Sequence, residues 1–151
     1  MRLSHHELCF GCGQQNLFGL ALELEPADGG GLTGRFFVKQ DHQGLDGAAH
    51  AGIIGAALEE AMTLVVDASD PGAARAPADG SRARTTRLEI DYRAPAPVGT
   101  FVEVRAWLEG PQDGQVVVRA VAFTAEDEAP VAEARAILSD ARVLGEQPVL
   151  E

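Results

Sequence analysis

The chain has 151 residues, of which 46% are apolar and 23% are charged; this is typical of one globular domain with a buried core rather than of a disordered segment. It contains no run of about 18 apolar residues, which argues against a membrane-spanning segment. Acidic side chains outnumber basic ones by 23 to 12, and the net charge of −11 argues against general nucleic-acid binding, which requires a positive field.

Two strands joined by a turn are predicted after an N-terminal segment that covers about residues 1–18. Residues 20–25 alternate leucine with alanine or glutamate, which is the period of a half-buried strand. Residues 26–31 (PADGGG) favour a turn, and residues 32–38 have the composition of a second strand. The two strands are therefore expected to form a hairpin.

One convincing helix is predicted, over residues 51–67, which are rich in Ala, Leu, Ile, Glu and Met and contain no Pro. At about 100° per residue, the larger apolar side chains share one broad face of this helix. The opposite side carries Gly52, Ala56, Glu59 and Thr63. Its small side chains indicate that another part of the chain covers it closely. Residues 69–81, which hold two Pro and two Gly, are predicted to be a connector.

The remainder of the sequence is strand-like. Four strands are predicted at about residues 85–92, 102–108, 116–124 and 131–139, with a turn at 110–114. The order of two strands, one long helix and four strands is an α+β arrangement. In it, one helix covers one face of a curved antiparallel sheet of about five to six strands.

Three motifs stand in a distinctive order and spacing. Residues 9–20 (CFGCGQQNLFGL) fit the pattern C-x-x-C-G-x-x-N-x-x-G-L. Residues 47–62 (GAAHAGIIGAALEEAM) approach the pattern H-G-G followed by an acidic helical residue. Residues 85–99 (TTRLEIDYRAPAPVG) fit the pattern T-x-x-L-x-(I/V)-x-Y-x-x-P-x-P-x-G. In all three the sequence resembles the hotdog-fold acyl-CoA thioesterases, in the branch of phenylacetate-pathway and thioesterase superfamily member 4-like enzymes. The resemblance implies a single hotdog domain over residues 1–151, in which 145–151 form a tail.

The resemblance also implies roles for four residues. Glu59 matches the family's catalytic carboxylate, and a glutamate can attack a thioester or activate water. Gly52 lies near the helix N-terminus, where an unpaired N–H can stabilise an oxyanion. His50 matches a residue that orients the loop, caps the helix or contacts substrate, and Thr85 one that lies near the thioester and the pantetheine arm. Without the resemblance, a solvated Glu, a turn Gly, a structural His and an ordinary strand Thr explain the same positions.

The spacing of two of these residues predicts the assembly. Gly52 and Glu59 are seven residues apart, which corresponds to about 10.5 Å along a helix. One carbonyl group cannot lie near both. Two antiparallel helices related by a twofold axis would place Gly52 of one chain beside Glu59 of the other, so an obligate homodimer with two shared sites is expected. The hotdog resemblance implies the same arrangement, and a dimer of dimers remains open.

Arginines cluster near the predicted thioester-binding strand. Four of the 12 cations are Arg82, Arg84, Arg87 and Arg93. Arginine suits the phosphates of coenzyme A, so this cluster is a candidate phosphate-binding site in an acidic chain. Pairing with Glu89, Asp91 or Glu103 across strands is the equally weighted alternative.

The two cysteines suggest a second hypothesis. Cys9 and Cys12 form a C-x-x-C pair, which is half of a typical zinc site, and His5, His6 and His42 could complete it. No second C-x-x-C and no spaced histidine pair accompanies them, and the resemblance implies neither metal nor cofactor. The sequence therefore favours no metal. Two cysteines without a secretion signal suggest free thiols in a reducing compartment, and a cytoplasmic protein is expected.

Acyl-CoA hydrolysis is thus the expected activity, with acyl-CoA and a second copy of the chain as partners and neither nucleic acid nor membrane. A non-catalytic acyl-CoA or small-ligand binding protein on the same scaffold is the alternative. It is conceivable because Ala51 stands where the family usually has the first Gly of a pair. A dehydratase of the same fold ranks last, since the motif of hydratases is not evident.

Overall fold

The computed structural model describes residues 2–69 and 83–139 of the chain. The elements follow in the order β1 (Glu23–Pro26), β2 (Leu32–Phe37), a 3₁₀ turn (Gln40–His42), α1 (Ala51–Ala68), β3 (Arg84–Tyr92), β4 (Phe101–Gln112), β5 (Gln115–Thr124) and β6 (Pro130–Ser139). The predicted order of two strands, one long helix and four strands is confirmed. Most of the predicted connector and the C-terminal tail lie outside the described residues.

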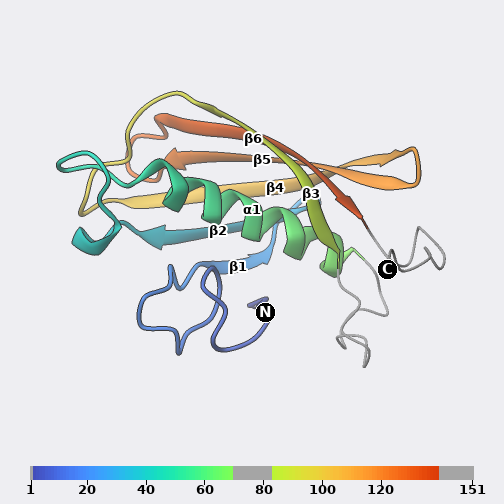
Figure 1. Ribbon diagram of the computed structural model, residues 1–151, viewed down its shortest axis with the longest axis horizontal. Helices are drawn as coiled ribbons and strands as arrows, with labels where there is room; N and C mark the ends of the chain where they lie inside the picture. The colour runs from blue at the N-terminus through green and yellow to red at the C-terminus, as the bar shows by residue number, and fades with distance from the viewer. Residues whose placement is uncertain (1, 70–82, 140–151) are drawn as a thin grey trace, which may run out of the picture.

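The six strands form one antiparallel sheet in the order β1-β2-β4-β5-β6-β3. Figure 1 shows the sheet curving around α1, with β3 crossing in front of the helix at the far edge of the sheet. This is the hotdog arrangement that the sequence predicted. No helix in the described part of the chain, the 18-residue α1 included, meets the requirements for spanning a membrane.

The core forms between the apolar face of α1 and the concave face of the sheet. Leu58 and Met62 on the helix are fully buried against side chains such as Val102, Val104 and Val118 on the central strands. Alternation along β4 places every second residue on this side, which is the periodicity on which its prediction rested. Burial of these side chains supplies the main driving force for folding.

The side of α1 that carries small residues is also covered. A Cβ atom added at Gly55 would lie 3.2 Å from Ile90 Cδ1 and 3.4 Å from Tyr92 Oη, so β3 packs closely on the helix there. Thr63 is buried on the same side. The strand β3 therefore covers the middle of this side, whereas Gly52 at the start of the helix stays exposed.

Two boundaries differ from the prediction. The first strand begins only at Glu23, because Ala21 has a φ of 49° and breaks the extended backbone. Residues before it bond to the N-terminal segment instead: the N–H groups of Leu20 and Leu22 donate to Phe10 O and Gly11 O. The alternating leucines are nevertheless buried, so the hydrophobic pattern was right and the strand assignment was too long.

The second difference is the hairpin between β4 and β5. A turn was predicted over residues 110–114, but β4 continues to Gln112 through a register shift between Leu108 and Gly110. Gly110 accommodates the shift with a φ of 141°. The turn itself is formed by Asp113 and Gly114, both at positive φ, as in the tight turns that suit twisted hairpins.

Candidate functional site

His50 caps the N-terminus of α1. This residue is the N-cap of α1, and its Nδ1 accepts a hydrogen bond of 2.8 Å from the Gly52 N–H. The structure therefore brings two predicted site residues together, with His50 in the capping role. Both Ala51 and Gly52 are exposed, so a ligand can approach this end of the helix. The Gly52 N–H becomes available to a substrate only when the His50 ring rotates away from it.

Two further predicted residues meet farther along the helix. Thr85 Oγ1, on β3, donates a hydrogen bond of 2.7 Å to Glu59 Oε1. Glu59 is half-buried, because β3 covers the side of α1 on which it lies. The contact fixes one carboxylate oxygen and leaves Oε2 without a bond to Thr85. The solvated-helix explanation of Glu59 does not fit this arrangement.

The strand β3 runs antiparallel to α1 along its length. Tyr92 Oη donates to Ala51 O at 2.8 Å at the start of the helix, whereas Thr85 contacts Glu59 two turns later. The helix is continuous between Gly52 and Glu59, so the spacing of about 10.5 Å that was expected from the sequence applies. Gly52 and the Glu59 carboxylate of one chain are therefore separated along the helix.

The predicted phosphate-binding arginines have different neighbours. Arg87 forms an ion pair of 2.7 Å with Glu89 on its own strand, and Arg93 pairs with Glu133 of β6 at 3.4 Å. Arg84 is exposed and directly precedes Thr85. Arg82 lies outside the described residues. Of the other partners considered, Glu103 pairs with Arg105 at 3.2 Å rather than with any arginine of the cluster.

A second group of reactive side chains lies on a different side of α1. His5 Nδ1 is 2.6 Å from Glu60 Oε1, and Cys9 Sγ donates to the same oxygen at 3.2 Å. Both Cys9 Sγ and Cys12 Sγ are 3.8 Å from His5 Nδ1. Cys12 is fully buried and Glu60 is 7% exposed, so both side chains lie in the interior rather than on a solvated face. We call His5, Cys9, Cys12 and Glu60 the N-terminal cluster.

The pKa values in this cluster reflect burial, which disfavours the charged forms, and hydrogen bonds, which oppose that effect. Burial alone would lower the pKa of His5, but hydrogen bonds to Asp67, Cys12 and Glu60 outweigh it and raise that pKa to about 12. Burial likewise opposes ionisation of Glu60, yet the bond to His5 and its charge bring the pKa of this carboxyl below its usual range. Burial first, and then the Glu60 charge, raise the pKa of the Cys9 thiol.

Sequence reasoning found only part of this cluster. It associated the cysteines with three histidines, of which only His5 joins them. His6 Nδ1 instead accepts from the Leu8 N–H at 3.3 Å, and His42 Nδ1 accepts from the Lys39 N–H at 3.0 Å. The pKa of His42 is lowered by burial and by the Lys39 charge. The Glu60 carboxylate was missed because its contact with the N-terminal segment spans more than fifty residues.

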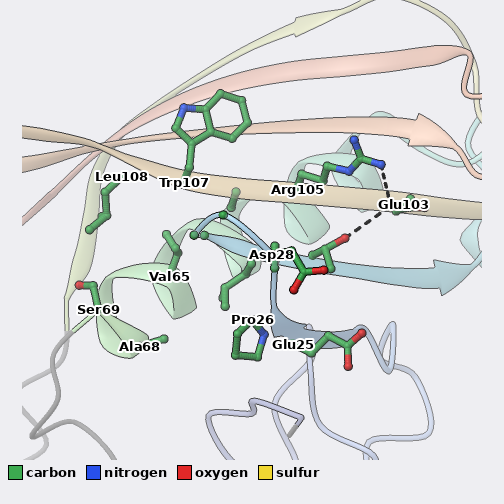
Figure 2. A pocket seen from close by; sticks show the side chains of 17 residues that line it. Glu25, Pro26, Asp28, Val65, Ala68, Ser69, Glu103, Arg105, Trp107 and Leu108 are labelled. Carbon is green, nitrogen blue, oxygen red and sulfur yellow. Dashed lines mark hydrogen bonds and ion pairs between the residues drawn. The ribbon is translucent and has the colours of Figure 1, made fainter.

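A large open depression lies elsewhere on the molecule. It has a volume of about 1100 Å³ and lies between the β1–β2 turn, the end of α1 and the outer part of β4 (Figure 2). Trp107 and Leu108 line one wall, and the Glu103–Arg105 ion pair lies on another. Of the predicted site residues that the structure describes, none lines it, so this hollow is separate from the Glu59–Thr85 contact.

Several solved structures are similar to this chain. No curated protein matches the chain. Among solved structures, protein RHA08564, a thioesterase superfamily protein, superposes with a TM-score of 0.74 at 18% identity over 89% of this chain. The match covers 61% of that protein, so the chain spans less than two thirds of its length.

Two further structures are each similar to about four fifths of the chain. The PaaI protein from the phenylacetic acid degradation operon of E. coli gives a TM-score of 0.65 at 15% identity, covering 80% of this chain and 83% of that one. A hypothetical thioesterase of Streptococcus pneumoniae TIGR4, solved with coenzyme A, gives 0.64 at 15%, covering 78% and 83%. At these identities the likeness shows the fold. A family model described as the thioesterase superfamily matches residues 46–131, more than half of the sequence, and the chain therefore belongs to the thioesterase superfamily.

Proposed function

We propose that this protein hydrolyses acyl-CoA thioesters to a free acid and coenzyme A, at sites shared between two copies of the chain. The observation that carries the proposal is the hydrogen bond from Thr85 to Glu59. It joins the carboxylate and the strand residue that two separate motifs single out. The chain's membership of the thioesterase superfamily supports the reaction class, and the coenzyme A bound to a relative of the same fold supports the ligand class.

Glu59 acts on the water that cleaves the thioester. Thr85 holds Oε1 and orients the carboxylate, while Oε2 takes a proton from the water molecule. The resulting hydroxide adds to the thioester carbonyl carbon, and the carbonyl oxygen becomes an oxyanion. When the tetrahedral intermediate collapses, the C–S bond breaks and the proton on Glu59 passes to the departing thiolate. A helix N–H at Gly52 stabilises the oxyanion once His50 has moved away.

The placement of β3 supports the shared site. This strand is the last in the sheet, and its other edge has no neighbour in the described part of the chain. Edge strands pair readily with another copy. Antiparallel pairing of two β3 strands about a twofold axis at Leu88, the middle of Arg84–Tyr92, would set Tyr92 of one chain opposite Arg84 of the other.

That pairing would join the two halves of the site. Tyr92 contacts the first residue of α1, whereas Arg84 precedes Thr85 and its partner Glu59. The Gly52 end of one helix would therefore lie beside the partner's Glu59. Exposed apolar side chains on β3, among them Leu88 at 38% and Tyr92 at 48%, would be covered by the same contact.

The test is release of free thiol from a panel of short, long and aromatic acyl-CoAs. The wild type should hydrolyse at least one class, and Glu59→Gln should lower kcat by about 10² to 10⁴, because general-base catalysis contributes on that order. Glu126→Gln, in the exposed β5–β6 turn, is the matched control and should keep full activity. Equal rates for Glu59→Gln and wild type would remove Glu59 from the mechanism. A single turnover in ¹⁸O water tests direct attack by Glu59, which would form a mixed anhydride with the acyl group; attack of water on the Glu59 carbonyl of that anhydride would leave label in its carboxylate.

A non-catalytic acyl-CoA binding protein is the second candidate. It is favoured by the occupied Gly52 N–H, which already donates to His50, together with Ala51 at the position of the family's usual Gly. Saturable binding of acyl-CoA by calorimetry, without thiol release for any member of the panel, would support this candidate instead.

A further inference from the structure

We propose that the N-terminal cluster of His5, Cys9, Cys12 and Glu60 is a structural zinc site. Each residue offers one ligand atom, and the four atoms lie within 4.8 Å of one another. Two thiolates, one imidazole and one carboxylate form a set that Zn²⁺ prefers, and four protein ligands complete its tetrahedral coordination. The acyl-CoA reaction described above uses none of these four side chains.

The distances between the ligand atoms fit tetrahedral coordination of zinc if the cluster expands slightly. Tetrahedral zinc with ordinary bond lengths separates sulfur from nitrogen by about 3.5 Å and nitrogen from oxygen by about 3.3 Å. His5 Nδ1 lies 3.8 Å from each Sγ, close to the first value. The 2.6 Å between His5 Nδ1 and Glu60 Oε1 is a direct hydrogen bond, which would open when an ion enters between them.

The surroundings of the ligands are those of a metal site. His5 presents Nδ1 to the cluster, and its Nε2 lies 3.5 Å from Asp67 Oδ2, which reproduces the carboxylate–histidine–metal arrangement. The His5 backbone N–H donates to Cys12 Sγ at 3.1 Å, which ties the backbone of one ligand residue to the sulfur of another. Asp67 lies on the same helix as Glu60, so α1 supplies both a ligand and the group that orients another ligand.

The loop between the cysteines is shaped to admit Glu60. A Cβ atom at Gly11 would lie 2.5 Å from Glu60 Cγ and 2.6 Å from Oε2, so any larger residue would displace the carboxylate. Gly13 N–H donates to Cys9 O at 2.9 Å and closes the turn. A Cβ at Gly13 would meet backbone atoms of Glu7 and Cys9 within 2.6 Å. The two glycines therefore allow the C-x-x-C loop to fold tightly over the helix.

The site would be structural rather than catalytic. All four coordination positions are filled by the protein, Cys12 and Glu60 are buried, and no position remains for a substrate. The ion would join the N-terminal segment to the middle of α1 at Glu60. Because Glu60 adjoins Glu59, the same ion would hold the stretch of helix that carries the carboxylate of the Thr85 contact.

The experiment uses the full chain, freed of metal with a chelator under reducing conditions and then titrated with Zn²⁺ or Co²⁺. We expect one Zn²⁺ per chain by mass spectrometry of the metal. Co²⁺ should give tetrahedral d–d bands near 600–750 nm. It should also give a thiolate charge-transfer band with the intensity expected for two sulfur ligands. Both readouts use the wild type, so they do not depend on whether a variant folds or on thioesterase activity.

Variants then assign the ligands. Cys9→Ser and Glu60→Gln should weaken Zn²⁺ binding by at least about 100-fold, and Cys9→Ser should lower the charge-transfer intensity of Co²⁺, because a sulfur ligand is lost. His6→Ala is the matched control; its side chain contacts the Leu8 N–H outside the cluster, and binding should not change. Stoichiometry near zero for the wild type, a Co²⁺ spectrum without a thiolate band, or undiminished binding by a Cys9→Ser/Cys12→Ser double variant would each overturn the proposal.

Discussion

Within residues 2–69 and 83–139, one short contact holds the Glu59 carboxylate, so its orientation depends there on one hydroxyl group. Thr85 Oγ1 donates to Oε1 at 2.7 Å, and hydrogen bonds to a charged group contribute about 1.5–3 kcal/mol when they are not screened. Both residues are half-buried, which reduces that value. Thr85 therefore acts as a positioning residue in the proposed reaction.

Removing this hydroxyl should lower turnover without unfolding the protein. Thr85→Val keeps the β-branched shape of a strand residue and should reduce kcat by about tenfold, whereas Thr85→Ser should retain most of it. The matched control is Thr86→Val, whose hydroxyl donates to Ile137 O on the adjacent strand instead. A Thr85→Val protein with a raised KM and an unchanged kcat would show that the residue binds substrate and does not position Glu59.

At this scale the sequence singled out Glu59 and Thr85 but not the contact between them. Glu59 and Thr85 belong to different motifs, and only the crossing of β3 over α1 brings them together. Glu60 shows the opposite case. It is one helical step of about 100° from Glu59 and therefore faces the N-terminal segment, where it meets Cys9 and His5. The two cysteines pointed to missing ligands, but no local pattern could name a helix residue so far along the chain.

Secondary structure was predictable wherever side-chain periodicity and backbone conformation agree. The helix over residues 51–67 and the strand over 32–38 match α1 and β2 within one residue. The two boundary errors occur where single residues leave extended geometry: Ala21 at positive φ shortens β1, and Gly110 forms an irregularity inside β4 rather than a turn. Hydrophobic alternation reports which side is buried, not where the hydrogen-bonded ladder begins.

The β5–β6 turn gives a prediction that concerns an element rather than the site. The Asp127 carboxylate accepts from Thr124 Oγ1 and from the Ala129 N–H. The Thr124 bond first, and then the backbone N–H, lower the pKa of Asp127 below its ordinary value of 3.8. A depressed carboxyl pKa adds stability above that value, and the contribution is lost as the pH falls through the folded-state pKa.

Asp127→Ala should therefore lower the unfolding midpoint at neutral pH, and the difference from wild type should shrink when the solution is acidified below about pH 3.8. Denaturant unfolding followed by circular dichroism at several pH values measures both midpoints. Glu126→Ala, in the same turn, controls for the loss of a negative charge from an acidic protein. A difference that stays constant across the pH range would mean that the turn gains nothing from ionisation of Asp127.

At the scale of the whole molecule, the proposed reaction depends on the exposed β3 edge of the sheet. The strand β3 pairs with β6 on one side only, and its nine residues are mostly exposed. It touches the start of α1 through Tyr92 and the middle through Thr85. A twofold contact along this edge would combine the complementary ends of two helices, while each end alone lacks the other half of the chemistry.

Heterodimers of two inactive chains test this sharing directly. Gly52→Val places bulk at the exposed helix N-terminus, since even a Cβ there would lie 3.0 Å from His50 Nδ1, and Glu59→Gln removes the carboxylate at the other end. Co-expression with two affinity tags and sequential purification yields a dimer that contains one chain of each kind.

If each site takes Gly52 from one chain and Glu59 from the other, one of the two sites carries both substitutions and the other carries neither. The heterodimer should then show about half of the wild-type kcat, although both parent proteins are inactive. If each site is built within one chain, both sites of the heterodimer are damaged and no activity returns. Light scattering on the same samples checks the assembly, and an active monomer would contradict the shared site independently of the variants.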